Sequence, residues 1–149
     1  MRTRRFRDRL DAGAQLSVLL GDLAGRDVTV LGLPRGGVPV AGVVADRLGA
    51  PLDALIVRKI GVPSHRELAV GAIGPDGAAL LDHDLMDRLG LSIEDLEPTI
   101  AAEREERHRR ELAYREGREP PDLRRRHVLV VDDGLATGAS MEAAVTGLR

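Results

Sequence analysis

The sequence predicts an α/β protein built on an open parallel sheet. Three short apolar runs rich in β-branched residues, at 28–33, 52–57 and 128–131, are typical of buried strands. Between these runs, apolar residues recur at helical spacing, so that predicted strands alternate with predicted helices. Such alternation favours parallel strands joined by right-handed crossovers.

Composition limits the class of protein. A chain of 149 residues with 43% hydrophobic and 31% charged residues is expected to form a single folded domain over residues 1–149. The formal net charge of −2 does not favour a nucleic-acid partner. The absence of cysteine excludes disulfides, zinc–thiolate sites, iron–sulfur clusters and cysteine nucleophiles. The four histidines lie far apart in the chain, and we expect no metal site built from protein side chains alone.

The N-terminal segment MRTRRFRDRL is basic and leads into AGAQLSVLLG, which has the general arrangement of a secretory signal. Asp8 and Asp11 interrupt that pattern, and the leucines of residues 16–23 recur at helical spacing, which favours an amphipathic helix. No segment reaches the roughly 18 apolar residues that a membrane span needs. The sequence therefore predicts a cytoplasmic protein with no membrane segment.

The first strand, 28–33, is expected to end at the sequence PRGG, residues 34–37, because proline and glycine break regular structure. Apolar residues then recur at helical spacing from Val40 to Leu48, and Gly49 is expected to end this helix. The second strand, 52–57, leads into Arg58-Lys59 and a loop that contains glycine and proline.

Two weaker strands are predicted at 68–73 and 78–81, around a turn at 74–77. Ser92 has the character of a helix N-cap, and Pro98 predicts either a kink or a new helix start soon after it.

The stretch from Pro98 to about Glu116 is rich in charged residues. Acidic and basic residues alternate in it, which favours a solvated helix face over a patch that binds anions. Glutamate and arginine recur four residues apart, an orientation that stabilises helices. These pairs are Glu103–Arg107, Glu105–Arg109 and Glu106–Arg110.

The segment VLVVDDGLATGAS, residues 128–140, carries the clearest chemistry. A buried strand ends in Asp132 and Asp133, and a loop with two glycines then opens a helix. In open parallel sheets, ligands bind at the carboxyl ends of strands, and a helix start offers N–H groups to phosphate. Adjacent carboxylates accept hydrogen bonds from vicinal sugar hydroxyls. The pattern predicts a sugar-phosphate site; the alternative is that both aspartates only end a strand and cap a helix.

This segment resembles the signature by which type I phosphoribosyltransferases bind 5-phosphoribosyl 1-diphosphate (PRPP). The resemblance implies that Asp132 and Asp133 contact the ribose hydroxyls and that the following loop binds the 5′-phosphate. The residues implied for the phosphate are Ala136, Thr137, Gly138, Ala139 and Ser140. Enzymes of the family that act on 6-oxopurines have an aspartate where this chain has Ala136, so the acceptor base is not implied.

Two further segments are similar to the family. The PRGG sequence lies where family members have a pyrophosphate-binding loop, often with an unusual peptide geometry, which implies pyrophosphate contacts from Arg35, Gly36 and Gly37. Arg58 and Lys59 lie where the mobile catalytic loop begins, and RKIGVPSHRELAVGAI is similar to uncharacterised phosphoribosyltransferase-like members. The resemblance implies a pyrophosphate contact for Arg58 and a role for Lys59 on the leaving group.

Glu67 is a candidate acid in the same loop, and a surface charge at the start of a strand is an equal interpretation of it. Of the 22 lysine and arginine residues, Lys59 is the only lysine, which suggests a need for lysine there.

The resemblance implies an enzyme that uses Mg²⁺, binds PRPP, and transfers its phosphoribosyl group to a small nitrogenous acceptor with release of pyrophosphate. Two alternatives are a non-catalytic regulatory protein that binds PRPP or a nucleotide, and an inactive fragment. Family members continue into a further strand beside the signature strand, so we expect the last strand or strands of the fold to be missing. An uncovered apolar strand favours association into homo-oligomers.

Overall fold

The computed structural model describes residues 5–149, which form two compact units. The first unit contains the described residues up to Leu55 together with Arg118–Leu135, and the second contains Ile56–Gly117 and Ala136–Arg149. The single domain expected over residues 1–149 stays a prediction, and so does the cytoplasmic location. The described part of the chain contains no helix that is long and apolar enough to cross a membrane.

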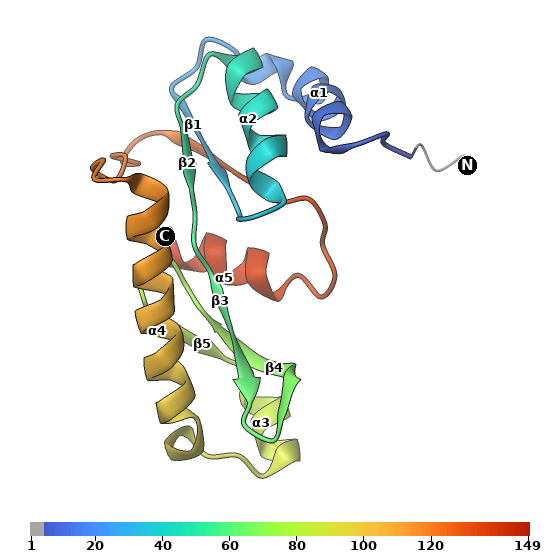
Figure 1. Ribbon diagram of the computed structural model, residues 1–149. Helices are drawn as coiled ribbons and strands as arrows, with labels where there is room; N and C mark the ends of the chain where they lie inside the picture. The colour runs from blue at the N-terminus through green and yellow to red at the C-terminus, as the bar shows by residue number, and fades with distance from the viewer. Residues whose placement is uncertain (1–4) are drawn as a thin grey trace. The chain divides into compact units, whose positions relative to one another are not determined.

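The first unit contains the predicted parallel sheet (Figure 1). Its strands are β1 (Val28–Gly32), β2 (Leu52–Ala54) and β6 (His127–Val131), arranged in the order β2-β1-β6 with both pairs parallel. The central strand β1 is buried along its whole length, as its continuous apolar sequence predicts. The predicted α/β fold with a parallel sheet is therefore confirmed.

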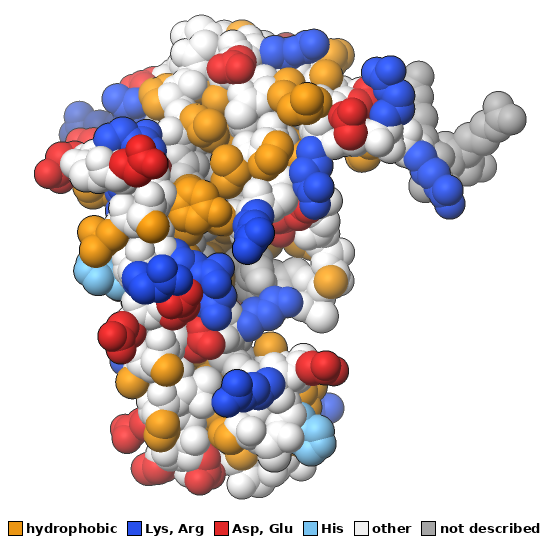
Figure 2. Space-filling model, viewed as in Figure 1, with side chains coloured by type: hydrophobic (Ala, Val, Ile, Leu, Met, Phe, Trp, Pro, Cys, Tyr) orange, Lys and Arg blue, Asp and Glu red, His pale blue; other side chains and the backbone are white. Residues whose placement is uncertain are grey.

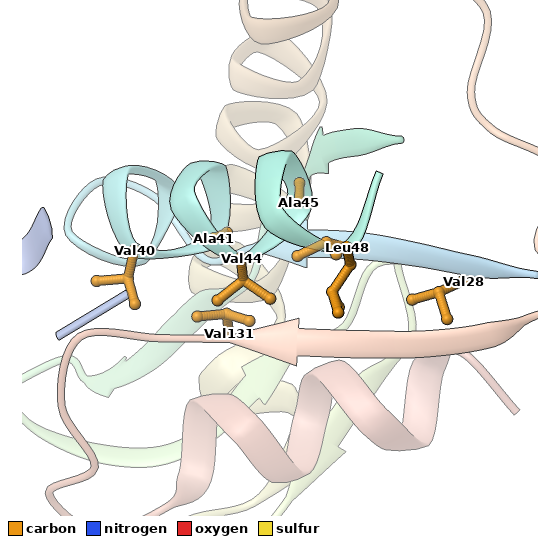
Figure 3. Packing of buried hydrophobic residues seen from close by; sticks show 8 residues of the cluster. Val28, Val40, Ala41, Val44, Ala45, Leu48 and Val131 are labelled. Carbon is orange, nitrogen blue, oxygen red and sulfur yellow. The ribbon is translucent and has the colours of Figure 1, made fainter. Parts of the chain in front are cut away.

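Helix α2 (Gly37–Leu48) packs its apolar face on this sheet, and α1 (Arg9–Leu19) packs on α2. Figure 3 shows side chains of α2, Val44 among them, directed at Val131 of β6. A short 3₁₀ helix, η1 (Gly21–Leu23), leads from α1 to β1. The helices expected on either side of the first strand are thus confirmed, although the N-terminal leucine pattern is divided between α1 and η1. The first four residues of the basic N-terminal segment lie outside the described residues.

The second unit is built on an antiparallel sheet. Strands β3 (Arg58–Val62), β4 (His65–Ile73) and β5 (Ala79–Leu81) pair in the order β3-β4-β5. The two weaker strands and the turn at 74–77 are confirmed, and the Gly77 N–H donates to the Gly74 carbonyl oxygen at 2.9 Å. The loop predicted to start at Arg58-Lys59 is wrong, because these residues open β3 and pair with Ile73 and Ala72 of β4. Ile60 and Val62 are two positions apart and both buried, as expected for one face of a strand.

Three helices complete the second unit: α3 (His83–Leu89), α4 (Ile93–Arg115) and α5 (Ala139–Gly147). The sequence did not predict α3, although Asp82 caps its start and Gly90 ends it in a left-handed conformation. The apolar core of the unit joins the antiparallel sheet to α3 and α4. Its buried residues are Ile60, Val62, Val70, Ile73, Met86, Leu96 and Ile100.

Helix α4 is continuous through Pro98, where a kink or a new start was predicted. Ser92 forms a capping box with Asp95, and the burial of Leu96 and Ile100 on either side of the proline anchors this part of the helix. These contacts offset the one backbone hydrogen bond that a proline removes from a helix interior.

The remainder of α4 is a charged face, and positive and negative side chains are interspersed along it in Figure 2. Glu106 pairs with Arg110 as predicted, at 2.7 Å, and also with Arg109. The predicted Glu103–Arg107 pair is wrong, because Glu103 binds Arg58 of β3 and Arg107 binds Glu111.

Leu96→Ala should lower the free energy of unfolding by about 2–5 kcal/mol, because it removes a side chain that is fully buried in the second unit and leaves a cavity. Leu112→Ala on the same helix is the matched control, because its side chain is 60% exposed and should change stability by less than about 0.5 kcal/mol. Urea denaturation followed by circular dichroism measures both. Equal losses in the two variants would contradict the assignment of Leu96 to the core.

Candidate active site

The site begins where β1 and β6 end side by side. The two strands are parallel and in register up to the pair Gly32–Val131. The Leu33 N–H extends the ladder by donating to the Val131 carbonyl oxygen at 2.9 Å. The residues that follow both strands therefore emerge at one edge of the sheet, which brings the PRGG loop (residues 34–37) next to Asp132 and Asp133.

Two glycines let the PRGG loop approach the end of β6 without side chains between them. A Cβ atom on Gly36 would lie 1.9 Å from Oδ2 of Asp133, and one on Gly37 would lie 2.5 Å from the carbonyl oxygen of Val131. Both distances are far shorter than any contact that a real Cβ makes. The carboxylate of Asp133 thus rests directly on the backbone of the loop.

The loop itself has an unusual geometry, as the family resemblance implies, because the peptide bond between Pro34 and Arg35 is cis. The Arg35 side chain is exposed, whereas Gly37 is buried. The Gly37 N–H donates to the Leu33 carbonyl oxygen at 2.9 Å. Gly37 therefore serves the loop by its close packing, and the pyrophosphate contacts of Arg35, Gly36 and Gly37 stay predictions.

Arg9 of α1 joins this edge and was not found from the sequence. Its Nε and Nη2 atoms both donate to Oδ2 of Asp133, at 3.1 and 2.7 Å. This hydrogen bonding lowers the pKa of the Asp133 carboxyl below its ordinary value. The carboxylate is consequently ionised at neutral pH and able to accept hydrogen bonds. In the sequence, Arg9 is one arginine in a segment with several, and it lies 124 positions from Asp133, so no local pattern indicates the pair.

A pocket of about 390 Å³ opens between α1, α2 and the end of β6. This volume falls within the range of small-molecule sites. One wall is apolar and includes Phe6, Leu16 and Val40, and the polar residues that line it include Arg9 and both aspartates. The backbone N–H of Asp133 donates to Oδ1 of Asp132 at 2.8 Å, which orients the Asp132 carboxylate. Of the three aspartates that line the pocket, Asp8 already caps α1 through Oδ1, and Asp132 and Asp133 could contribute oxygen ligands to a divalent cation.

The second part of the signature belongs to the other unit. Gly138, with a φ of 83°, precedes α5 as its N-cap, and the Ala139 N–H donates to the Thr137 hydroxyl oxygen at 3.4 Å. The predicted loop that opens a helix is therefore present. The 5′-phosphate contacts of Ala136, Thr137, Gly138, Ala139 and Ser140 stay predictions.

The remaining predicted residues lie on the antiparallel sheet. Arg58 donates from Nε to Oε2 of Glu103 at 2.7 Å, so its guanidinium already has a carboxylate partner within the second unit. Lys59 is exposed on β3, and Glu67 is exposed on β4. The roles predicted for these three residues stay predictions.

Comparisons with known proteins identify relatives of this chain. A family model described as a phosphoribosyl transferase domain matches residues 11–149. Two curated proteins of Mycobacterium tuberculosis are each 49% identical to the chain over 139 residues, which cover 93% of it. Their names are "Putative phosphoribosyl transferase Rv0571c" (strain H37Rv) and "Putative phosphoribosyl transferase MT0597" (strain CDC 1551). The chain spans only 31% of the length of each.

A solved structure is also similar. The crystal structure of the protein TT1426 from Thermus thermophilus superimposes with a TM-score of 0.76 at 45% sequence identity. The match covers 95% of this chain and 67% of the Thermus chain. The family match, the sequence identity and the shared fold together show that the chain belongs to the type I phosphoribosyltransferase family.

Proposed function

We propose that this chain is the PRPP-binding domain of a transferase that moves a 5-phosphoribosyl group to a nitrogenous acceptor and releases pyrophosphate. The observation that carries the proposal is the seating of the Asp133 carboxylate on Gly36 of the PRGG loop. The Asp133 carboxylate can accept hydrogen bonds from sugar hydroxyls, and the PRGG loop is suited to pyrophosphate. Their contact places both at one edge of the sheet. PRPP carries its pyrophosphate on C1, next to the hydroxyls of C2 and C3, so the two ligand groups are also adjacent.

In this reaction the bond from C1 to the pyrophosphate oxygen breaks, and its electron pair leaves with pyrophosphate. The lone pair of the acceptor nitrogen forms the new C1–N bond, and the proton of that nitrogen passes to solvent. Positive charge develops on the sugar ring, as at other glycosidic centres. The carboxylates of Asp132 and Asp133 hold the ribose hydroxyls and orient the ring, so this chain contributes positioning and charge stabilisation.

The resemblance to the family implies Mg²⁺, and the residues at this edge suit it. Mg²⁺ is bound through one or two carboxylates together with substrate phosphates and water, and Asp132 and Asp133 supply carboxylates beside the proposed pyrophosphate loop. When bound, Mg²⁺ would offset the negative charge of the leaving pyrophosphate.

Asp132→Asn/Asp133→Asn should remove most of the affinity for PRPP, because amides at these positions lose the charge that strengthens hydrogen bonds from the hydroxyls. A charge-matched control is Asp22→Asn/Asp46→Asn, which changes two exposed aspartates of the same unit. Titration calorimetry with PRPP and Mg²⁺ compares them. Unchanged binding in the site variant would contradict the site, whereas binding without pyrophosphate release with any base would favour a regulatory protein over an enzyme.

Gly36→Ala should weaken PRPP binding by roughly tenfold or more, because the added methyl group occupies the position of the Asp133 carboxylate and forces that side chain or the loop to move. Gly42→Ala on α2 is the matched control, since its new Cβ meets only Leu52 Cδ2, at 3.9 Å. The same calorimetric titration measures both variants. Wild-type affinity in Gly36→Ala would show that the seating of Asp133 on the loop is not needed for binding.

Lys59→Ala should leave PRPP binding nearly unchanged and lower the rate of the chemical step by roughly 10²–10³, the effect of losing one group that stabilises charge in the transition state. Lys59→Arg should recover part of the rate, because a planar guanidinium replaces a compact ammonium. Pyrophosphate release in single-turnover experiments provides the rate. A Lys59→Ala variant with the parent rate would exclude Lys59 from catalysis.

A further inference from the structure

Arg9 is held at the sheet edge by the packing of α1 on α2. A Cβ on Gly13 of α1 would lie 2.8 Å from Cβ of Val43 and 2.9 Å from the carbonyl oxygen of Val40, so the two helices touch backbone to backbone. Asp8 caps α1 by accepting from the Asp11 N–H at 2.8 Å. The cap fixes where α1 begins, and the packing of Gly13 fixes its position on α2. The guanidinium of Arg9 therefore lies close to the end of β6.

The contact that Arg9 makes there is of a kind that exchanges readily. The side chain of Arg9 is 57% exposed and that of Asp133 is 32% exposed. Ion pairs this exposed contribute little to stability, because water solvates both partners when they separate. Nε and Nη2 of Arg9 both donate to the same oxygen, Oδ2 of Asp133. The guanidinium therefore lacks the two-oxygen contact that its planar shape favours.

Binding of PRPP changes both partners of this pair. Two vicinal ribose hydroxyls that donate to both oxygens of the Asp133 carboxylate would compete with Arg9 for Oδ2. Asp133 rests on Gly36, so a pyrophosphate group on the PRGG loop lies beside the guanidinium that the hydroxyls displace. Phosphate oxygens match the planar fork of arginine better than a single carboxylate oxygen does.

We propose that Arg9 is a further pyrophosphate-binding residue, supplied by α1, that exchanges Asp133 for pyrophosphate oxygens when PRPP binds. The proposal rests on the proposed function. It adds a cation from outside the two family motifs to the site, and it gives the Arg9–Asp133 pair a use in the free protein. The pair keeps the guanidinium at the place where the leaving group arrives.

The experiment separates this role from the simpler one, in which Arg9 only holds Asp133 in position. Inorganic pyrophosphate with Mg²⁺, PRPP with Mg²⁺ and ribose 5-phosphate are titrated separately into the wild-type chain, Arg9→Ala and Arg9→Lys. Arg7→Ala is the matched control, because Arg7 is an exposed arginine in the same segment and pairs with Asp11 instead. Thermal unfolding of each variant checks the fold.

Arg9→Ala should weaken pyrophosphate and PRPP binding by roughly 10- to 100-fold, the effect of losing one charge-assisted contact. Ribose 5-phosphate should bind unchanged or slightly more tightly, because its hydroxyls no longer compete with Arg9 for Asp133. Arg9→Lys should recover part of the pyrophosphate affinity, and Arg7→Ala should match the wild type.

A loss of ribose 5-phosphate affinity as large as the loss for pyrophosphate would show that Arg9 only positions Asp133, and would overturn the proposal. No change for either ligand would overturn it as well. Failure of the proposed function is distinct, since the wild-type chain would then bind neither PRPP nor ribose 5-phosphate.

Discussion

The parallel pairing of β1 with β6 is the constraint on which the candidate site depends. The two strands are far apart in sequence, and their register ends at the pair Gly32–Val131. Because the strands run in the same direction, the segments that follow them leave the sheet at the same edge and level. A shift of this register would separate the PRGG loop from Asp132 and Asp133. The apolar sequences of both strands and the packing of α2 on them therefore determine where the polar residues meet.

Glycines allow the PRGG loop to contact the end of β6 directly. Gly36 and Gly37 bring the loop backbone against Asp133 and the end of β6, at distances that a side chain would prevent. In the same way, the missing side chain of Gly13 lets α1 pack closely on α2, which positions Arg9 next to Asp133. Each of these glycines acts through a missing Cβ, and none of them has a positive φ. Close backbone approach, more than loop flexibility, is what the sequence supplies at this edge.

The buried elements were predictable because a strand or helix packed on a core carries its pattern locally. Residues 28–33 predicted a strand that is buried along its length, whereas the strand predicted at 128–131 is buried only at Val131. PRGG and DDGLATGAS predicted the segments that follow these strands. The change from parallel to antiparallel pairing at Arg58 was not predictable, because alternation indicates a strand and not its partner. The role of Arg9 was not predictable, because its contact with Asp133 depends on the packing of α1. No sequence motif near residue 9 indicates that packing.

The ion pairs of Arg58 and Arg9 differ in how exposed they are to water. Arg58 and Glu103 are 29% and 23% exposed, and their pair joins β3 to α4. If Arg58 left Glu103, two partly buried charges would lose their partners. A pyrophosphate contact by Arg58 therefore has a cost in stability. Arg9 has no such cost, because water already reaches most of its side chain. Of these two arginines, Arg9 is therefore the one that can leave its carboxylate partner at little cost, although only Arg58 lies in a segment that resembles the family's catalytic loop.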